Sequence, residues 1–266
     1  MLARVLRSES ASASARLIST RLIHLRVAKK GRIRKRLPFS SVHCSGSEGT
    51  FVGERLKLTS GSHYIQSLDD AIDLFNEMVR SRPLYSAIDF NKLIGVIVRM
   101  ELPGVAISLY QKMELLQIPC NICSFDILIK CFCDCHKFSF ALSTFGKITK
   151  LGFQPNVVTF NTLINGFCIE DRMLEAVALF DRMVEEGHQP DVVTYGTIVN
   201  GMCKIGDTVS ALNLLRKMEE CHIEANVRIY NAIIGCLCKD GHHGDAQNLF
   251  TEMQEKGISP NVPTAV

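Results

Sequence analysis

The chain repeats itself every 35 residues, and this period constrains the fold more than any other feature. The segment NVVTFNTLINGFC, from Asn156 to Cys168, returns as DVVTYGTIVNGMC and then as NVRIYNAIIGCLC. A period of about 20–50 residues is typical of solenoids, in which each repeat is one supersecondary unit. We number the positions of a unit from 1 to 35, with position 1 at Val157. Complete units then cover residues 87–121, 122–156, 157–191, 192–226 and 227–261.

The constant positions predict two amphipathic helices in every unit. Position 4 is aromatic, position 8 is Ile or Val, and position 20 is Ala in all five units. Positions 4, 8 and 11–12 share one face of a first helix, and positions 20, 23–24 and 27 share one face of a second. The small Ala allows two helices to approach closely. In three units a Gly and a Pro follow the second helix and end it: Gly152, Gly187 and Gly257, and Pro155, Pro190 and Pro260.

A single helical hairpin cannot bury both apolar faces, but hairpins that stack on one another can. The predicted fold is therefore all-α, a right-handed superhelical solenoid of 35-residue helical hairpins. Residues 67–86 carry only the second-helix pattern, and we interpret them as a half-repeat that caps the stack. Residues 46–66 are predicted to be a linker, and residues 262–266 the stub of a truncated repeat.

Positive charge is concentrated at the beginning of the chain. Residues 1–50 hold 11 Lys and Arg against 2 acidic residues, whereas the remainder holds 19 basic and 25 acidic residues. An Arg- and Ser-rich stretch with almost no acid is typical of organelle-targeting peptides. We interpret residues 1–45 as a disordered transit peptide for the mitochondrion, with the plastid as the alternative. A basic tail or a nucleic-acid arm is the other interpretation of the same charges.

Several classes of function find little support in the sequence. Charges interrupt every apolar run before the roughly 18 residues of a membrane span, so we expect no membrane partner. The chain has no Gly-rich phosphate loop, His-Glu-x-x-His or nucleophile elbow, so we expect no enzyme. We also expect no cofactor.

The 11 Cys residues raise the question of disulfides and metals. Four of them share position 12, which indicates a packing position rather than a disulfide framework: Cys133, Cys168, Cys203 and Cys238. The stretch CFCDCHK places three Cys at alternate positions, which point about 200° apart on a helix and cannot converge on one ion. A zinc site among Cys236, Cys238, His242 and His243 is the weaker alternative to a polar turn.

The constant positions resemble the pentatricopeptide repeat family of organelle RNA-binding proteins. The resemblance covers about residues 67–261, and Val157 to Asp191 reads much like a typical unit of that family. Phrases such as AIDLFNEMVRSRP resemble the fertility-restorer group of plant mitochondria. The tetratricopeptide repeat is the nearest alternative, but its period is about 34 residues and it usually carries Trp, which this chain lacks.

This resemblance implies a function and a set of site residues. In such proteins each unit reads one base of single-stranded RNA; position 5 faces the base, position 35 helps to choose it, and position 2 supplies a wall. The base-reading pairs are then Asn91 with Asn121, Asp126 with Asn156, Asn161 with Asp191, Gly196 with Asn226, and Asn231 with Asn261. The wall residues are Ile88, Cys123, Val158, Val193 and Arg228.

The pairs give a partial RNA address. The Asn161 pair resembles one that prefers U, and the pairs of Asn91 and Asn231 resemble pyrimidine readers that lean to C. Gly196 has no side chain to read with, so its unit is expected to be permissive. Arg228 could stack on a base or meet a phosphate. Further phosphate ligands, or else ordinary solvated cations, are Lys92, Arg99, Lys130, Lys137 and Lys204.

Two functions remain open at this point. The first is sequence-selective binding of organellar RNA that supports its processing, stability or translation, with RNA-processing proteins as further partners. The second is a truncated repeat scaffold that contacts proteins or has no RNA-binding function, which the five complete units and the short stub motivate.

Overall fold

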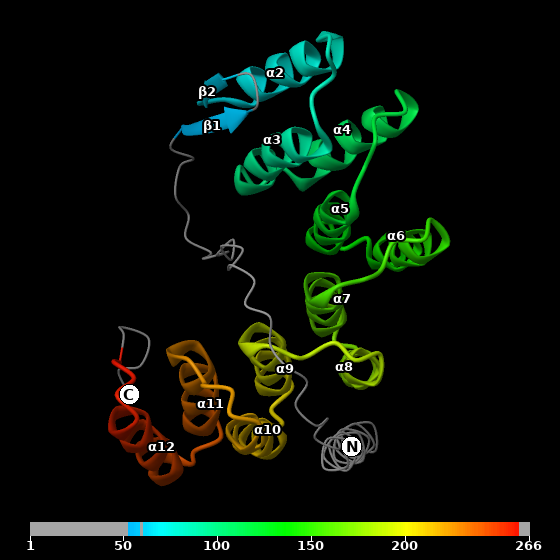
Figure 1. Ribbon diagram of the computed structural model, residues 1–266. Coiled ribbons are helices and arrows are strands. Elements are labelled where there is room, and N and C mark those ends of the chain that lie inside the picture. The colour runs from blue at the N-terminus through cyan, green and yellow to red at the C-terminus, as the bar shows by residue number, and fades with distance from the viewer. Residues whose placement is uncertain (1–52, 59–60, 261–266) are drawn as a thin grey trace, which may run out of the picture. The chain divides into compact units, whose positions relative to one another are not determined.

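The computed structural model describes residues 53–58 and 61–260, the coloured part of Figure 1. The predicted transit peptide, the stub and Asn261 lie outside the described residues. The described part has eleven α-helices and one two-stranded sheet. It divides into two compact units, one ending at Ile127 and the other starting at Leu128, inside helix α5.

The first compact unit begins with a β-hairpin and continues with helices. Its elements are β1 (Glu54–Leu58), β2 (Gly61–Ile65), α2 (Leu68–Arg80), α3 (Ala87–Arg99), α4 (Pro103–Leu115) and the first part of α5 (Ile122–Asp134). Ser67 caps α2 by accepting a hydrogen bond from the backbone N–H of Asp70, whose carboxylate binds the N–H of Ser67 in return.

The second compact unit consists of helices. After the remainder of α5 come α6 (Phe138–Lys150), α7 (Val157–Ile169), α8 (Met173–Glu185), α9 (Val192–Lys204), α10 (Thr208–Glu220), α11 (Val227–Lys239) and α12 (His243–Glu255). In every repeat the first helix begins at position 1 and the second at position 17. The first helices α7, α9 and α11 pack side by side, each against the next (Figure 1). The predicted all-α fold class, built from helical hairpins, is confirmed.

One correction concerns the segment that we expected to be a linker. Within residues 46–66, the structure has an antiparallel β-hairpin in which Glu54 pairs with Ile65 and Leu58 with Gly61. Leu56 and Leu58 alternate with polar residues and are buried, as on the inner side of a half-buried strand. Strand β1 packs on α3 and β2 packs on α2. In the second compact unit, the first helix α7 packs on the corresponding pair, its own second helix α8 and the next first helix α9. The hairpin therefore covers a surface that a first helix covers elsewhere.

The same aromatic contact joins successive repeats. A ring at position 24 of one repeat lies beside the ring at position 4 of the next. The ring centroids are 5.6 Å apart for Phe75 with Phe90 and for Phe180 with Tyr195. These rings meet edge to face, an arrangement that the aromatic quadrupole favours. The Ala residues at position 20 are buried in all five repeats. Sequence analysis identified these positions as helix faces, and the structure adds which faces meet.

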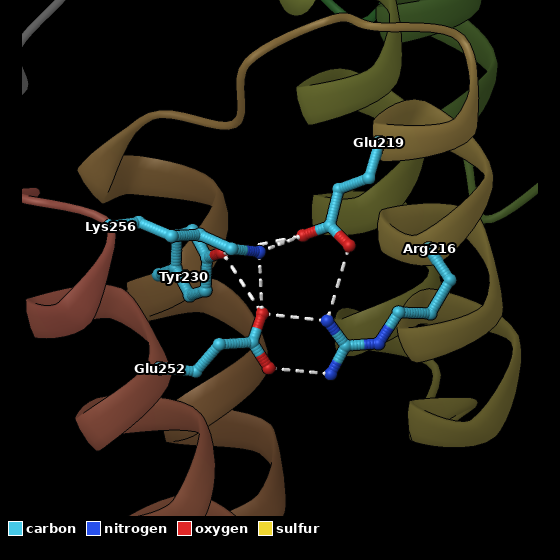
Figure 2. Close-up of polar contacts among 5 residues, drawn as sticks. All are labelled: Arg216, Glu219, Tyr230, Glu252 and Lys256. Atoms are coloured by element: carbon cyan, nitrogen blue, oxygen red, sulfur yellow. Dashed lines mark hydrogen bonds and ion pairs between the residues drawn. The ribbon is translucent and has the colours of Figure 1, made fainter.

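Between the last two repeats, position 24 is Leu215, and a charged network links the second helices (Figure 2). Arg216 on α10 donates two hydrogen bonds of 2.6 Å to the carboxylate of Glu252 on α12. Lys256 donates to Glu252 at 2.7 Å and also contacts Glu219. The hydrogen bonds from Arg216 lower the pKa of Glu252 to about 2, so this carboxylate is charged at neutral pH.

The recurring thiols at position 12 pack against position 10 of the next repeat. A Cβ atom added at Gly201 would lie 2.7 Å from the sulfur of Cys168, so glycine is needed for this close approach. At the last repeat boundary Cys236 occupies position 10, where its sulfur lies 2.7 Å from the Thr208 hydroxyl oxygen. The cysteines of the described residues are free thiols, and no cluster of three or more metal-ligating side chains occurs among these residues.

Candidate nucleic-acid interface

The first helix of each repeat positions the candidate reading residues. Positions 2 and 5 of a repeat lie within the first two turns of this helix. Position 35 of the preceding repeat is the residue immediately before it. Residues three apart share one face of a helix, so positions 2 and 5 lie together, while positions 4 and 8 point into the core. The sequence therefore separates a packing face from a face that is available for contacts.

The wall residues lie at the surface. Ile88, Val158 and Val193 are 60%, 54% and 50% exposed, although all three are aliphatic. Cys123 and Arg228 are also exposed. An aliphatic side chain that stays half in water leaves apolar area free for a flat ligand to cover.

Position 35 has a structural role that our sequence analysis missed, because it caps the first helix of the next repeat. Asn156 Oδ1 accepts from the backbone N–H groups of Val158 and Thr159 at 2.8 and 3.0 Å. Asn226 caps α11 in the same way. The signal was present in the sequence, since Asn or Asp just before a helix is a strong N-cap, and Ser or Thr three residues later can complete a capping box.

Two of the predicted reading pairs are in direct contact. Asn91 Nδ2 donates to Asn121 Oδ1 at 2.9 Å, and Asn161 Nδ2 donates to Asp191 Oδ1 at 3.2 Å. In both residues the amide oxygen, Oδ1, is buried and has no hydrogen-bond partner among the described residues. A buried acceptor without a partner is disfavoured by about 1–3 kcal/mol. In each of these candidate reading amides, one of the two N–H donors is thus engaged and the oxygen is unused.

The other pairs differ. Asp126 is buried, and its predicted partner Asn156 belongs to the other compact unit. Asn231 is half-buried, whereas its predicted partner, Asn261, is not described. Gly196 brings no side chain to Asn226, and the side chain of Ile229 lies beside it instead. The structure thus shows direct contact for two pairs, each of which lies within one compact unit.

Three of the five candidate phosphate ligands are engaged by protein groups, which corrects our expectation for them. Arg99 donates two hydrogen bonds to Glu54, at 2.9 and 2.7 Å. Lys92 donates to the backbone carbonyl of Lys57 at 3.1 Å. The β-hairpin, which the sequence pattern did not reveal, supplies both of these partners.

The third such cation, Lys130, pairs with Asp134 one turn further along α5, at 2.9 Å. This spacing of four residues was visible in the sequence. Lys137 and Lys204 are exposed. We therefore retain Lys137 and Lys204 as the candidate phosphate ligands.

The described part of the chain is a tandem helical-repeat protein, because it reuses one two-helix unit with the same boundaries, caps and interhelical contacts. No helix in this part is long and apolar enough to span a membrane. The chain belongs to the pentatricopeptide repeat family. It matches the PPR repeat family over residues 155–204 and 225–265, the pentatricopeptide repeat domain over 108–169, and the PPR repeat over 193–223.

Relatives from Arabidopsis thaliana extend this finding. The pentatricopeptide repeat-containing protein At1g64100 is 64% identical over 130 residues, which are 49% of this chain and 18% of that protein. The mitochondrial pentatricopeptide repeat-containing protein At1g62680 is 39% identical over 138 residues, covering 48% of this chain and 25% of the relative. The chain thus matches a quarter or less of the length of these relatives.

Solved structures share the fold. The pentatricopeptide repeat protein PPR10 from maize, in complex with an 18-nucleotide psaJ RNA element, aligns with a TM-score of 0.65 at 19% identity, over 73% of this chain and 28% of PPR10. The PPR domain of Arabidopsis thaliana protein-only RNase P 1, in complex with tRNA, aligns with a TM-score of 0.52 at 15% identity, over 64% of this chain and 90% of that domain.

Proposed function

We propose that this protein binds single-stranded RNA on the exposed side of its first helices, with one base at each repeat. The observation that carries the proposal is the unused amide oxygen of Asn91 and Asn161, at the same position of two different repeats. Buried polar groups without partners are rare and call for an explanation, such as a ligand that supplies the missing donor. Family membership and the RNA-bound state of the solved relatives support this explanation.

The proposed selectivity comes from the family resemblance, and hydrogen-bond chemistry is consistent with it. One of the two amide N–H donors of Asn161 is engaged by Asp191, so the other N–H and the amide oxygen are left for the base. Uracil presents its N3–H donor on the pairing edge, and cytosine presents its N4 amino group. The address is then pyrimidine at the first repeat, U at the third and pyrimidine at the fifth, with the second and fourth unassigned. Val158 and Val193 would cover the faces of the base between successive repeats.

Electrostatics favour a modest contribution from phosphate contacts. Beyond residue 50 the chain has 19 basic and 25 acidic residues, and three cations near the first helices are paired with protein groups. A small number of free lysines gives a shallow dependence of RNA affinity on salt. Selectivity and affinity would therefore depend mainly on the walls and on the reading amides.

We place this activity in the mitochondrion. The Arg- and Ser-rich residues 1–45 fit an organelle-targeting peptide, and the relative At1g62680 is a mitochondrial protein. Binding without catalysis would act by shielding a transcript, by opening its structure, or by recruiting a protein that processes it. These are the routes by which such a binder supports RNA processing, stability or translation.

A binding selection with the full chain tests the proposal. The chain is titrated against randomised single-stranded RNA in a gel shift, and the bound RNA is sequenced. We expect U to be enriched at one place, and Asn161→Thr to shift that place towards a purine. Asn165→Thr, on an exposed position of the same helix, is the matched control and should leave the selection unchanged. No binding at micromolar protein in low salt would falsify the proposal.

A further inference from the structure

We propose that Ile229, at position 3 of the fifth repeat, is a second residue that determines base specificity at the fourth repeat, and that together with Gly196 it makes the fourth repeat accept any base. This inference rests on the proposed function. It concerns residues of the second compact unit only, where the third, fourth and fifth repeats pack in sequence. In this unit, the boundary between the third and fourth repeats differs from the boundary between the fourth and fifth at positions 5 and 3.

At the boundary between the third and fourth repeats, three polar residues meet at one oxygen. Asp191 Oδ1 accepts from Asn161 Nδ2 at 3.2 Å, and from the backbone N–H and the hydroxyl of Thr194 at 2.9 Å each. Position 3 of the fourth repeat, Thr194, therefore helps to fix the oxygen that holds the reading amide. The first compact unit contains the same arrangement.

That second example consists of Asn91, Asn121 and Ser124. Asn121 Oδ1 accepts from Asn91 Nδ2 at 2.9 Å, from the Ser124 N–H at 3.0 Å and from the Ser124 hydroxyl at 3.1 Å. Two independent boundaries thus build one device from positions 5, 35 and 3. Its product is an amide that is held through one N–H and whose oxygen has no hydrogen-bond partner among the described residues.

At the boundary between the fourth and fifth repeats, two of the three residues differ together. Position 5 is Gly196, and position 3 is Ile229, whereas position 3 is Asp, Ser or Thr in the other four repeats. A Cβ atom at Gly196 would lie 3.4 Å from Cγ1 and 3.7 Å from Cδ1 of Ile229, which is only 2% exposed. The apolar side chain therefore fills the space in which the polar device is built elsewhere.

The consequence for RNA is a repeat that holds a base without reading it. Asn226 Oδ1 accepts from the backbone N–H groups of Arg228 and Ile229 at 3.1 and 3.2 Å, which caps α11. Ile229 has no hydroxyl to add, and Gly196 has no amide to be held. The walls Val193 and Arg228 remain exposed and offer contacts that depend little on base identity.

Restoring selectivity therefore requires both residues to change. In Gly196→Asn the new side chain meets Ile229 and finds no hydroxyl that fixes the Asn226 oxygen. In Ile229→Thr the hydroxyl returns, but there is no amide to read the base. Only the double variant recreates the set Asn, Asn and Thr, which closely matches Asn91, Asn121 and Ser124. The gain in selectivity should be non-additive, as it is for residues that share one partner.

The test measures the affinity of the full chain for four RNAs that differ only at the nucleotide facing the fourth repeat. We expect the unchanged chain and each single variant to bind all four within about twofold, and the double variant to prefer a pyrimidine by about tenfold. Gly196→Ala with Ile229→Val keeps the pair apolar and is the matched control, with no preference expected. Circular dichroism verifies that each variant is folded. If the double variant unfolds, Gly196→Asn with Ile229→Ser replaces it, since Ser124 occupies that position naturally.

The outcomes separate this inference from the proposed function. If Asn161→Thr leaves the base preference at the third repeat unchanged, the proposed function fails. If that preference responds but the folded double variant gains none at the fourth repeat, the role of Ile229 is overturned. Equal selectivity in Gly196→Asn alone, or a base preference at the fourth repeat of the unchanged chain, overturns it too.

Discussion

Positions 5, 35 and 3 make polar contacts at the boundary between the third and fourth repeats, but an apolar contact at the boundary between the fourth and fifth. In the first, Asp191 holds Asn161 and Thr194 by hydrogen bonds. In the second, Ile229 packs against Gly196, and Asn226 is left with the helix cap alone. Both boundaries join first helices that begin at position 1. The stacking of repeats is thus independent of the chemistry at the reading position, and that chemistry is free to vary.

The largest difference between the two boundaries should appear when position 3 is truncated. Ile229→Ala removes a buried aliphatic side chain and should lower the free energy of unfolding by about 3 kcal/mol. Thr194→Ala removes one hydroxyl and should lower it by about 1 kcal/mol. Urea denaturation of the full chain measures both. Equal losses would mean that the apolar boundary is not held by packing.

A smaller contrast is expected at position 35. Asp191→Ala removes the helix cap together with the hydrogen bonds to Asn161 and to the Thr194 hydroxyl, and should destabilise the protein by about 2 kcal/mol. Asn226→Ala removes the cap alone and should destabilise it by about 1 kcal/mol. The comparison uses the same denaturation. Asp191→Asn keeps the cap and serves as the control, with a small loss expected.

At position 5 we expect a substitution to raise the free energy of unfolding rather than to lower it. Gly196→Ala should stabilise the protein by about 0.7 kcal/mol, because alanine is favoured over glycine in a helix and the added Cβ meets Ile229 at ordinary contact distance. Gly235→Ala, on α11 with open space around it, is the control and should give a similar gain. If Gly196→Ala destabilises the protein while Gly235→Ala does not, then Ile229 leaves no room for a side chain at position 5.

The smallest expected effect concerns the charged network that links the second helices of the last two repeats (Figure 2). The hydrogen bonds from Arg216 hold the pKa of Glu252 in the folded chain at about 2, below the ordinary glutamate value of 4.5. Its contribution to stability is therefore complete above about pH 4.5 and is lost as the pH falls towards 2. Thermal unfolding across this range should fall more steeply for the unchanged chain than for Glu252→Gln. If the two proteins depend on pH in the same way, the network does not stabilise the last two repeats.

The helices were predictable because their signals recur. Five copies of an aromatic residue at position 4 and Ala at position 20 fix the faces, and the structure buries those residues. The β-hairpin was missed because it occurs once, its strands are five residues each, and no repeat pattern marks it. Its partners Arg99 and Lys92 were consequently misjudged as free cations.

The candidate site was predictable by position but not by geometry. The resemblance selects Asn161 and Asp191, yet only coordinates show that a single oxygen of Asp191 serves both the amide and the next helix. This contact joins residues 30 apart, and nothing in the local sequence reports the orientation of an amide. The pairing of Gly196 with Ile229 is likewise a contact between neighbouring repeats, visible only once they are stacked.

The shared oxygen at position 35 has an evolutionary consequence. Under the proposed function, a mutation there would alter both the choice of transcript and the stability of the following helix, because one atom serves both. Only the short polar side chains that cap helices well, mainly Asn, Asp, Ser and Thr, are compatible with both demands. Few residue types would therefore be available at position 35 when the protein adapts to a new transcript. Position 5 accepts a wider range of residues, as Asn161 and Gly196 illustrate.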